Sequence, residues 1–292
     1  MTHRRSYRDE PALADEVFAL LGRVFPGEPL DRARLAALRF GAPWEAASTP
    51  YVHRVGSGLV SHVGLLALDV MIGDRPWRVG GVHAVATDPA HRRRGHYGRI
   101  MAELLADADR RFEGLLLTTA HPEYFRAFGF RVVPEWTFRA EVAAKGGGLA
   151  SRLLDLEAAS DRAVIHRLLE RRAPLSPVLS LGREKCVWAF YEAESPLRFV
   201  PALDLVMVAE RRVGGVALHD VIAPRLPPLE DLLAAWPEPV GFVEARFSPE
   251  HLDPRFRSAP LEPSEGDGTV LMARGPLPID GRPLRLGRGG RC

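Results

Sequence analysis

The stretch Val82–Arg99, which reads VHAVATDPAHRRRGHYGR, constrains the fold and the chemistry of this chain more than any other segment. A short apolar run ends at Thr87-Asp88-Pro89, three arginines and Gly95 follow, and an amphipathic segment begins directly afterwards. This order is typical of a strand, a basic glycine-bearing turn and the first turn of a helix. Free backbone N–H groups and the positive end of the helix dipole then face the turn, so we expect an anion site suited to a phosphate-bearing cofactor.

Apolar periodicity gives the order of the other elements. In the first half, helical spacing is seen at 11–25, 30–40, 97–112 and 122–128, and strands are expected at 51–55, 59–71, 77–87, 115–119 and 130–133. After a glycine linker at 145–148 the order partly repeats, with helices at 161–171, 184–191 and 228–235 and strands at 202–209, 213–222, 240–247 and 269–273. The repeat lacks a basic glycine loop and therefore predicts a second, degenerate lobe.

The expected architecture follows from this repetition. We expect an α/β protein with two lobes of similar topology, each a mixed, mostly antiparallel twisted sheet flanked by helices. The first domain is expected over residues 1–145 and the second over residues 150–277. The segment 278–292 is rich in Gly, Pro and Arg, so we expect it to be a flexible tail.

Composition argues against several classes of protein. A net charge of +2 gives no case for bulk nucleic-acid binding, and the arginine bias is general because Lys145 and Lys185 are the only lysines. Cys186 and Cys292 lack metal-ligand spacing, so no metal site and no disulfide framework are expected, as in a reducing cytosol. No apolar run reaches membrane-spanning length and residues 1–11 lack a signal-peptide core, so we expect a cytoplasmic protein that does not enter membranes.

With these residues in place, the first lobe resembles the GNAT superfamily of N-acetyltransferases, over Leu13–Phe138 and most closely over Val82–Phe130. The family motif Arg/Gln-x-x-Gly-x-Gly/Ala corresponds to Arg92–Tyr97, in which Tyr97 replaces the final small residue. The segment is also similar to acetyltransferases of the "enhanced intracellular survival" type, but those carry a third, sterol-carrier-like domain for which this chain is too short. It more closely resembles bacterial GNAT proteins with an active N-terminal lobe and a degenerate C-terminal lobe.

The resemblance implies acetyl-CoA as the cofactor and an amine as the acceptor. Its pyrophosphate is expected over Arg93–Gly98, its pantetheine arm along Val82–Thr87, and a backbone N–H near Val85 at the oxyanion. The implied cofactor-binding residues are Val85, Ala86, Thr87, Arg92, Arg93, Arg94, Gly95, His96, Tyr97, Gly98 and Arg99.

Two side chains are candidates for catalysis. His83 would be the general base, since the strand period of two places it on the face of Val85 and Thr87, where many GNAT enzymes have a glutamate. The family's general acid is often a tyrosine four residues before the glycine that is Gly129 here, and Phe125 stands at that position. Either the neighbouring Tyr124 is the acid or no protein acid is used.

Structural roles are the alternatives for these residues: a core histidine at 83 and a packing tyrosine at 124. His62 and His121 could line the same cleft, but structural roles are favoured for both. Neither cysteine lies near the motif in sequence, so no covalent acyl-enzyme is expected.

These observations predict an N-acetyltransferase that transfers acetyl directly to a primary amine of a small molecule or peptide. Tyr97 and Phe125 keep open a catalytically idle acyl-CoA-binding sensor or scaffold, and the arginine-rich tail leaves a nucleic-acid-associated protein as a weaker alternative. The second lobe is expected either to form the surface of a homodimer or to wall the acceptor cleft.

Overall fold

The computed structural model describes residues 3–73, 75–262 and 266–292. The helices are α1 (Leu13–Val24), α2 (Leu30–Phe40), α3 (Trp44–Ala47), α4 (His96–Arg111), α5 (Glu123–Arg126), α6 (Ala159–Glu170), α7 (Cys186–Glu192) and α8 (Leu229–Ala234), with short 3₁₀ turns η1 (Pro89–His91), η2 (Pro201–Leu203) and η4 (Arg288–Gly290). The strands are β1 (Thr49–Val55), β2 (Gly58–Ile72), β3 (Arg75–Thr87), β4 (Gly114–Thr119), β5 (Arg131–Val133), β6 (Trp136–Ala144), β7 (Arg152–Leu153), β8 (Ser180–Leu181), β9 (Leu197–Val200), β10 (Leu205–Arg212), β11 (Gly215–Ile222), β12 (Val240–Ala245), β13 (Arg257–Pro260) and β14 (Val270–Arg274).

The strands form two mixed sheets, which confirms the predicted α/β class with two lobes. The first sheet has the order β1-β2-β3-β4-β14-β5, with β8 pairing to β2, and the second has the order β13-β6-β12-β11-β10-β9-β7. Among the strand pairs of the described residues, only β3–β4 and β11–β12 are parallel, so both sheets are mostly antiparallel. Each lobe therefore has one parallel pair within an otherwise antiparallel sheet.

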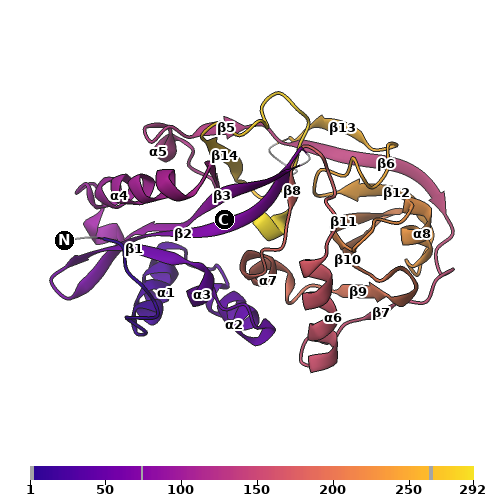
Figure 1. Ribbon diagram of the computed structural model, residues 1–292, viewed down its shortest axis with the longest axis horizontal. Helices are drawn as coiled ribbons and strands as arrows, with labels where there is room; N and C mark the ends of the chain where they lie inside the picture. The colour runs from indigo at the N-terminus through magenta and orange to yellow at the C-terminus, as the bar shows by residue number, and fades with distance from the viewer. Residues whose placement is uncertain (1–2, 74, 263–265) are drawn as a thin grey trace.

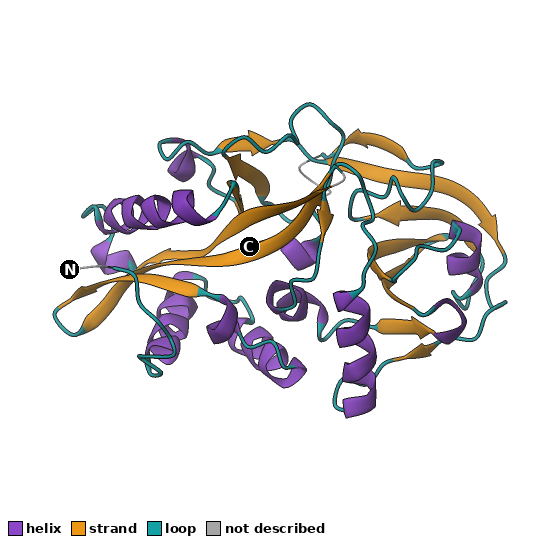
Figure 2. Cartoon of the chain, in the orientation of Figure 1, coloured by secondary structure: helices purple, strands orange, loops and turns teal. Residues whose placement is uncertain are grey.

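Helices cover both faces of the first sheet. Figure 2 shows α4 and α5 on one side of the long β2–β3 ribbon and α1, α2 and α3 on the other. The α4 side buries Val63, Val82 and Ile100, and the α1 side buries Val52, Ala86 and Val17. The segment between β3 and α4 is thus held at one end of the sheet by packing on both faces.

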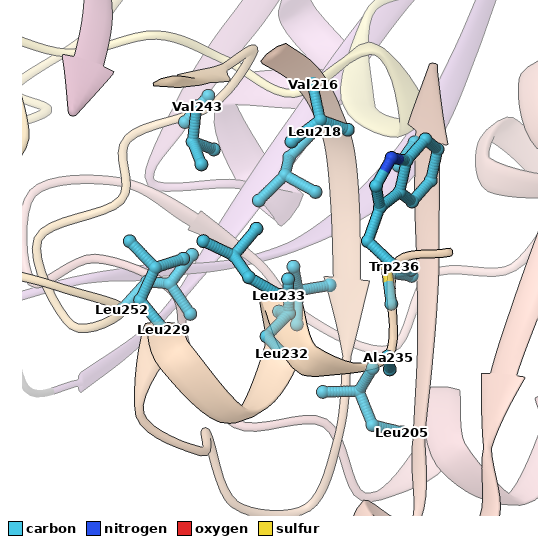
Figure 3. Close-up of a cluster of buried hydrophobic side chains, with 14 of the residues drawn as sticks. Leu205, Val216, Leu218, Leu229, Leu232, Leu233, Ala235, Trp236, Val243 and Leu252 are labelled. Atoms are coloured by element: carbon cyan, nitrogen blue, oxygen red, sulfur yellow. The ribbon is translucent and has the colours of Figure 1, made fainter. Parts of the chain in front are cut away.

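The second lobe has its own apolar core beneath α8. Figure 3 shows Leu229, Leu232 and Leu233 of this helix pointing at Val216 and Leu218 of β11. These side chains are almost completely removed from water. The helical spacing of leucines in α8 matches the alternation of small apolar residues in the strand, and this match fixes the helix on that face.

The two sheets exchange strands across the predicted domain boundaries. β6 follows β5 in the chain yet lies in the second sheet, between β13 and β12. β14, expected as a strand of the second lobe, lies in the first sheet, between β4 and β5 (Figure 1). The sequence divided the chain into consecutive segments, because alternation within a strand does not reveal which sheet receives it.

The expectation of a flexible tail at residues 278–292 is wrong. Ile279, Leu284 and Leu286 are buried in the core of the first lobe. The Leu284 carbonyl accepts a hydrogen bond from the Trp136 N–H at 2.8 Å, and Arg291 forms a buried ion pair with Glu135 at 3.0 Å. The glycines and prolines of this segment shape a tight course over the sheet, and its few leucines supply the apolar contacts.

A core substitution in this segment tests the packing. Leu284→Ala should lower the free energy of unfolding by about 2–4 kcal/mol, because it leaves a cavity where the side chain is fully buried. Urea unfolding of the purified variant measures this change. Val213→Ala is the matched control, because Val213 is fully exposed and its loss should change stability by less than about 0.5 kcal/mol. Equal effects of the two substitutions would contradict the packed course of the tail.

Candidate functional site

The loop between β3 and α4 leaves the start of α4 open to solvent. Arg93 has a φ of 61° and Gly95 a φ of 76°, so the chain turns twice through the left-handed region before α4 begins. No side chain caps the first turn of α4. Its N–H groups therefore remain available to an anion, and the helix dipole adds positive potential there.

The three loop arginines differ in what holds them. The Arg92 and Arg94 guanidinium groups donate to the carbonyls of Thr87 and Ala90. Arg93 is exposed and makes no hydrogen bond or ion pair within the described part of the chain. Among the described residues, the loop thus presents the free guanidinium of Arg93 beside an uncapped helix start, an arrangement that suits a phosphate.

Four imidazoles lie next to this loop. His96, the first residue of α4, stacks on His53 of β1 with ring centroids 4.5 Å apart, and His3 and His91 lie 5.1 and 6.4 Å from this pair. Burial lowers the pKa of His96, as do Arg99, His91 and Arg94. Burial likewise lowers the pKa of His53, with His96 as the next cause. Both rings are therefore held neutral, and both ring nitrogens of His96 lack a partner among the described residues.

The strands β3 and β4 separate close to this loop. Their parallel pairing covers only Val79–Gly81 against Gly114–Leu116, although β3 continues to Thr87 and β4 to Thr119. Beyond these pairs the two strands form no further ladder with each other. This unpaired stretch, called the opening from this point on, lies at the same end of the sheet as the start of α4. An extended ligand can pair with a strand edge that lacks a neighbouring strand.

A bulge in β3 lies on the edge of this opening. His62 of β2 pairs with Ala86, and Gly64 pairs with His83, so one residue of β2 faces both Ala84 and Val85. Ala84 has a φ of 49°. The extra residue reverses the alternation of side chains, so the expectation that His83 shares a face with Val85 and Thr87 is wrong: Val85 packs on the α4 side, and His83 faces Trp44 on the other.

His83 is enclosed on the α1 side of the sheet. Its Nε2 lies 3.0 Å from Ser48 Oγ, and the edge of Trp44 meets its ring at 4.4 Å between centroids. The ring lies directly over Gly64, where a Cβ would come within 2.1 Å of it. Burial, and then the neighbouring His62, lower the pKa of His83 well below its ordinary value, so the imidazole is neutral near pH 7. Its Nδ1 has no described partner.

Tyr124 and Tyr97 lie apart from His83. Tyr124 is exposed, stacks on His121 at 5.2 Å, and makes no hydrogen bond to His83 within the described residues. Tyr97 packs edge-on against Phe125 and Phe128, and its hydroxyl donates to the Tyr124 carbonyl. The bulky residue in the motif is thus accommodated between α4 and α5 by aromatic packing.

The remaining candidate cofactor residues follow the strand and the helix. Ala86 is buried on the α1 side, and Thr87 Oγ1 lies 2.8 Å from Ser61 Oγ. Gly98 and Arg99 continue the first turns of α4, where Gly98 has open space around its Cα. Because the Ala86 side chain is buried, this residue can meet a ligand only through its backbone. The Arg99 side chain is exposed near the loop.

Sequence reasoning missed Cys292. Its main-chain oxygen accepts hydrogen bonds from the N–H and Oγ1 of Thr118 at 2.7 and 2.9 Å, and its Sγ lies against Gly81. Cys292 therefore lies beside the opening, although it is 174 residues from Thr118 in the chain. Burial, and then Glu184, raise the pKa of its thiol to about 12, so the thiol stays protonated near pH 7.

Groups of side chains suited to a metal ion are absent from the described residues. The same residues include no helix with the length and apolar composition needed to cross a bilayer. The features that remain are an anion site, a strand opening and a buried imidazole.

Comparison with known proteins identifies this arrangement. Residues 8–133 match the model of the acetyltransferase (GNAT) domain family. The whole chain is similar in fold to a conserved Enterococcus faecalis V583 protein, a probable N-acyltransferase (TM-score 0.61, 14% identity, 96% of this chain and 73% of the other). It is also similar to Eis1 of Mycobacterium abscessus (0.57, 19%, 89% and 71%) and to a GCN5-related N-acetyltransferase of Kribbella flavida (0.56, 18%, 90% and 68%). No protein of curated function matches the sequence significantly.

Residues 8–133 are therefore a GNAT acetyltransferase domain, which confirms the resemblance seen in the sequence. The similarity to these solved structures extends over both sheets, so the whole chain shares their fold.

Buried neutral histidines predict a loss of stability in acid. His62 is completely buried, and burial lowers its pKa from 6.5 to about 4, so the unfolded chain takes up a proton that the folded chain refuses. The free energy of unfolding should fall as the pH drops below 6.5. Urea unfolding at about pH 7 and about pH 5.5 measures how much free energy of unfolding each protein loses between the two pH values. This loss should be smaller by about 1 kcal/mol in His62→Asn than in the unaltered chain. An equal loss in both proteins would contradict a neutral His62.

Proposed function

We propose that this chain is an N-acetyltransferase that moves the acetyl group of acetyl-CoA directly to a primary amine. The observation that carries the proposal is the uncapped start of α4 beside the place where the pairing of β3 with β4 ends. The first feature suits a pyrophosphate, and the second suits the extended arm that joins it to the thioester. Membership of residues 8–133 in the GNAT domain family supports the same reading.

The residues present fit such a cofactor. Arg93 offers an unpaired guanidinium, and Arg94 and Arg99 extend positive charge along the first turns of α4. The edge of β3 from Val82 to Thr87 lies beyond the last pair with β4. Acetyl-CoA supplies an activated acyl thioester and a thiolate leaving group of pKa about 8.5, which leaves readily without a strong acid.

The chain's own groups can then assist the transfer. The amine nitrogen forms a bond to the acyl carbon, the bond to sulfur breaks, and the amine loses a proton. Val85 N–H, outside the β2–β3 register, stabilises negative charge on the acyl oxygen. His83 is neutral and its Nδ1 is unpaired, so it takes the proton through a water molecule.

A protein acid is not required by this proposal. Tyr124 is exposed and lies on the outer side of α5, and Phe125 is buried in the core. We propose that the leaving sulfur takes its proton from solvent, with Tyr124 next to the opening rather than in it. The cytoplasm is the proposed location, and the acceptor is proposed to be a small molecule or a peptide.

The enclosure of His83 favours one alternative, an idle acyl-CoA-binding sensor. A sensor would bind CoA through the same loop and acetylate no amine. Incubating the protein with acetyl-CoA and a broad panel of amines, with mass spectrometry of the products, separates the two functions. Acetylated product supports the transferase, and tight CoA binding without product across the panel supports the sensor.

Negative charge introduced into the loop tests the cofactor site. Gly95→Glu places a carboxylate in the uncapped turn and should raise the Kd for CoA at least ~100-fold in isothermal titration calorimetry. Arg93→Glu avoids the backbone strain at Gly95, because residue 93 is already a non-glycine in the left-handed region, and should raise it about 10- to 100-fold.

Gly148→Glu is the control, because Gly148 is exposed in the connection between β6 and β7 of the second sheet, and a Cβ there would have only ordinary contacts. Its Kd for CoA should equal that of the unaltered chain. Unchanged affinity in both loop variants would overturn the cofactor site.

The base is tested by its pH profile. His83→Ala should lower kcat about 100-fold, while the unaltered enzyme shows no inflection near pH 6.5, because burial keeps His83 neutral through that range. The remaining rise of kcat/KM with pH should follow the deprotonation of the amine. His251→Ala, at an exposed position in the second lobe, serves as the control. An unchanged rate in His83→Ala would remove this residue from the mechanism.

A further inference from the structure

We infer that His62 is a positioning residue: its imidazole holds the bulge at Ala84 and Val85 so that the Val85 N–H is turned toward the opening between β3 and β4. This inference rests on the proposed function, because it assigns a source of order to the oxyanion donor. His62 itself touches neither the cofactor nor the amine in this assignment.

His62 makes a hydrogen bond from its side chain to the backbone of β3. Its Nδ1 lies 2.8 Å from the carbonyl oxygen of Ala84, the residue that departs from the β2–β3 ladder. A carbonyl oxygen only accepts, so Nδ1 carries the proton and donates it. The contact joins two residues that are neighbours across the strands but are not paired by backbone register, since His62 pairs with Ala86.

This hydrogen bond orients the peptide group between Ala84 and Val85. A trans peptide is planar, and its C=O and N–H point in opposite directions. The carbonyl of Ala84 and the N–H of Val85 belong to the same peptide. Because His62 of β2 holds that carbonyl, the Val85 N–H points away from β2. β3 lies between β2 and β4 in the sheet, so this direction leads to the side on which β4 lies.

The backbone of Ala84 is strained. Ala84 adopts a φ of 49°, a left-handed conformation that the Cβ of an L-residue disfavours. Such a conformation persists where surrounding contacts determine it. Ala84 has no register partner in β2, and the imidazole of His62 is the side-chain contact on its carbonyl.

Burying an imidazole at position 62 costs free energy. His62 is completely buried, and its Nε2 has no partner among the described residues. An unpaired buried nitrogen is unfavourable, and an apolar side chain would avoid that cost. The hydrogen bond to the Ala84 carbonyl explains why a histidine stands at position 62, whereas apolar packing alone does not. Burial lowers the pKa of His62 to about 4, so the ring stays neutral over the range in which an amine is acetylated.

Two substitutions separate positioning from packing. His62→Leu removes the donor and keeps a similar apolar volume, whereas His62→Asn retains an N–H near the place of Nδ1. Under the proposed function, Leu should lower kcat about 10- to 100-fold with KM for acetyl-CoA and Kd for CoA changed by less than about threefold, and Asn should restore kcat to within about threefold. A packing role would lower the melting temperature of both variants and leave kcat per folded molecule unchanged.

His219→Leu is the matched control. His219 is a largely buried histidine of the second lobe whose pKa burial likewise lowers to about 4, and it lies on β11, in the second sheet. Its kcat should equal that of the unaltered enzyme. Equal kcat in His62→Leu and His219→Leu would overturn the inference.

A structural readout keeps the inference separate from the proposed function. Crystal structures of the unaltered chain and of His62→Leu should show Ala84 moving out of the left-handed region in the variant. If the unaltered chain binds CoA but acetylates no amine, the proposed function fails while this comparison still decides the role of His62. A left-handed Ala84 in His62→Leu would overturn the positioning role regardless of activity.

Discussion

The ladder between β3 and β4 ends after three residue pairs, and every feature of the candidate site depends on that ending. Gly80 and Gly81 bring the two strands together, since a Cβ at Gly80 would come within 2.7 Å of Leu115. Past this point the two strands are no longer paired with each other. The bulge, the start of α4 and the loop arginines lie at this end of the sheet, where Thr118 of β4 is bonded to Cys292 and β3 has no partner in β4. A fully paired sheet would have had no place for an extended ligand.

The opening is held by segments that are distant in the sequence. β14 pairs with β4 on the side away from β3, and the segment that follows it returns over the sheet until Cys292 binds Thr118. The second lobe thus ends inside the first. Because these contacts span most of the chain, we expect the first lobe to complete its packing only after the second lobe is in place.

Buried imidazoles give the site its chemical character. His62 and His83 lie on one face of the sheet with ring centroids 6.4 Å apart, and burial keeps both neutral. A neutral imidazole can accept a proton from an amine, and it can donate one hydrogen bond to a carbonyl. In the proposed reaction the two residues divide these tasks, since His83 faces Ser48 with an unpaired Nδ1 while His62 donates to Ala84.

The anion loop was predictable because its information is local. Arg92–Gly95 and the amphipathic helix after it specify a strand, a turn and an uncapped helix start through residues that are adjacent in the chain. The face of His83 was predicted wrongly, because a strand period of two holds only without a bulge, and the register of β2 against β3 introduces one. Ser48 and Cys292 gave no signal, because their spacing in sequence bears no relation to the site.

The sequence by itself determined the α/β class, the GNAT domain and the strand, basic turn and helix start at which we propose a phosphate site. These properties follow from periodicity and from backbone groups within about 20 consecutive residues. Tertiary structure alone decided which sheet received β6 and β14, that the last residues are packed, and that His62 binds the Ala84 carbonyl. Those outcomes are set by pairing and burial between segments that are distant in the chain, and a hydrogen bond from a side chain on the neighbouring strand leaves no pattern in the order of residues.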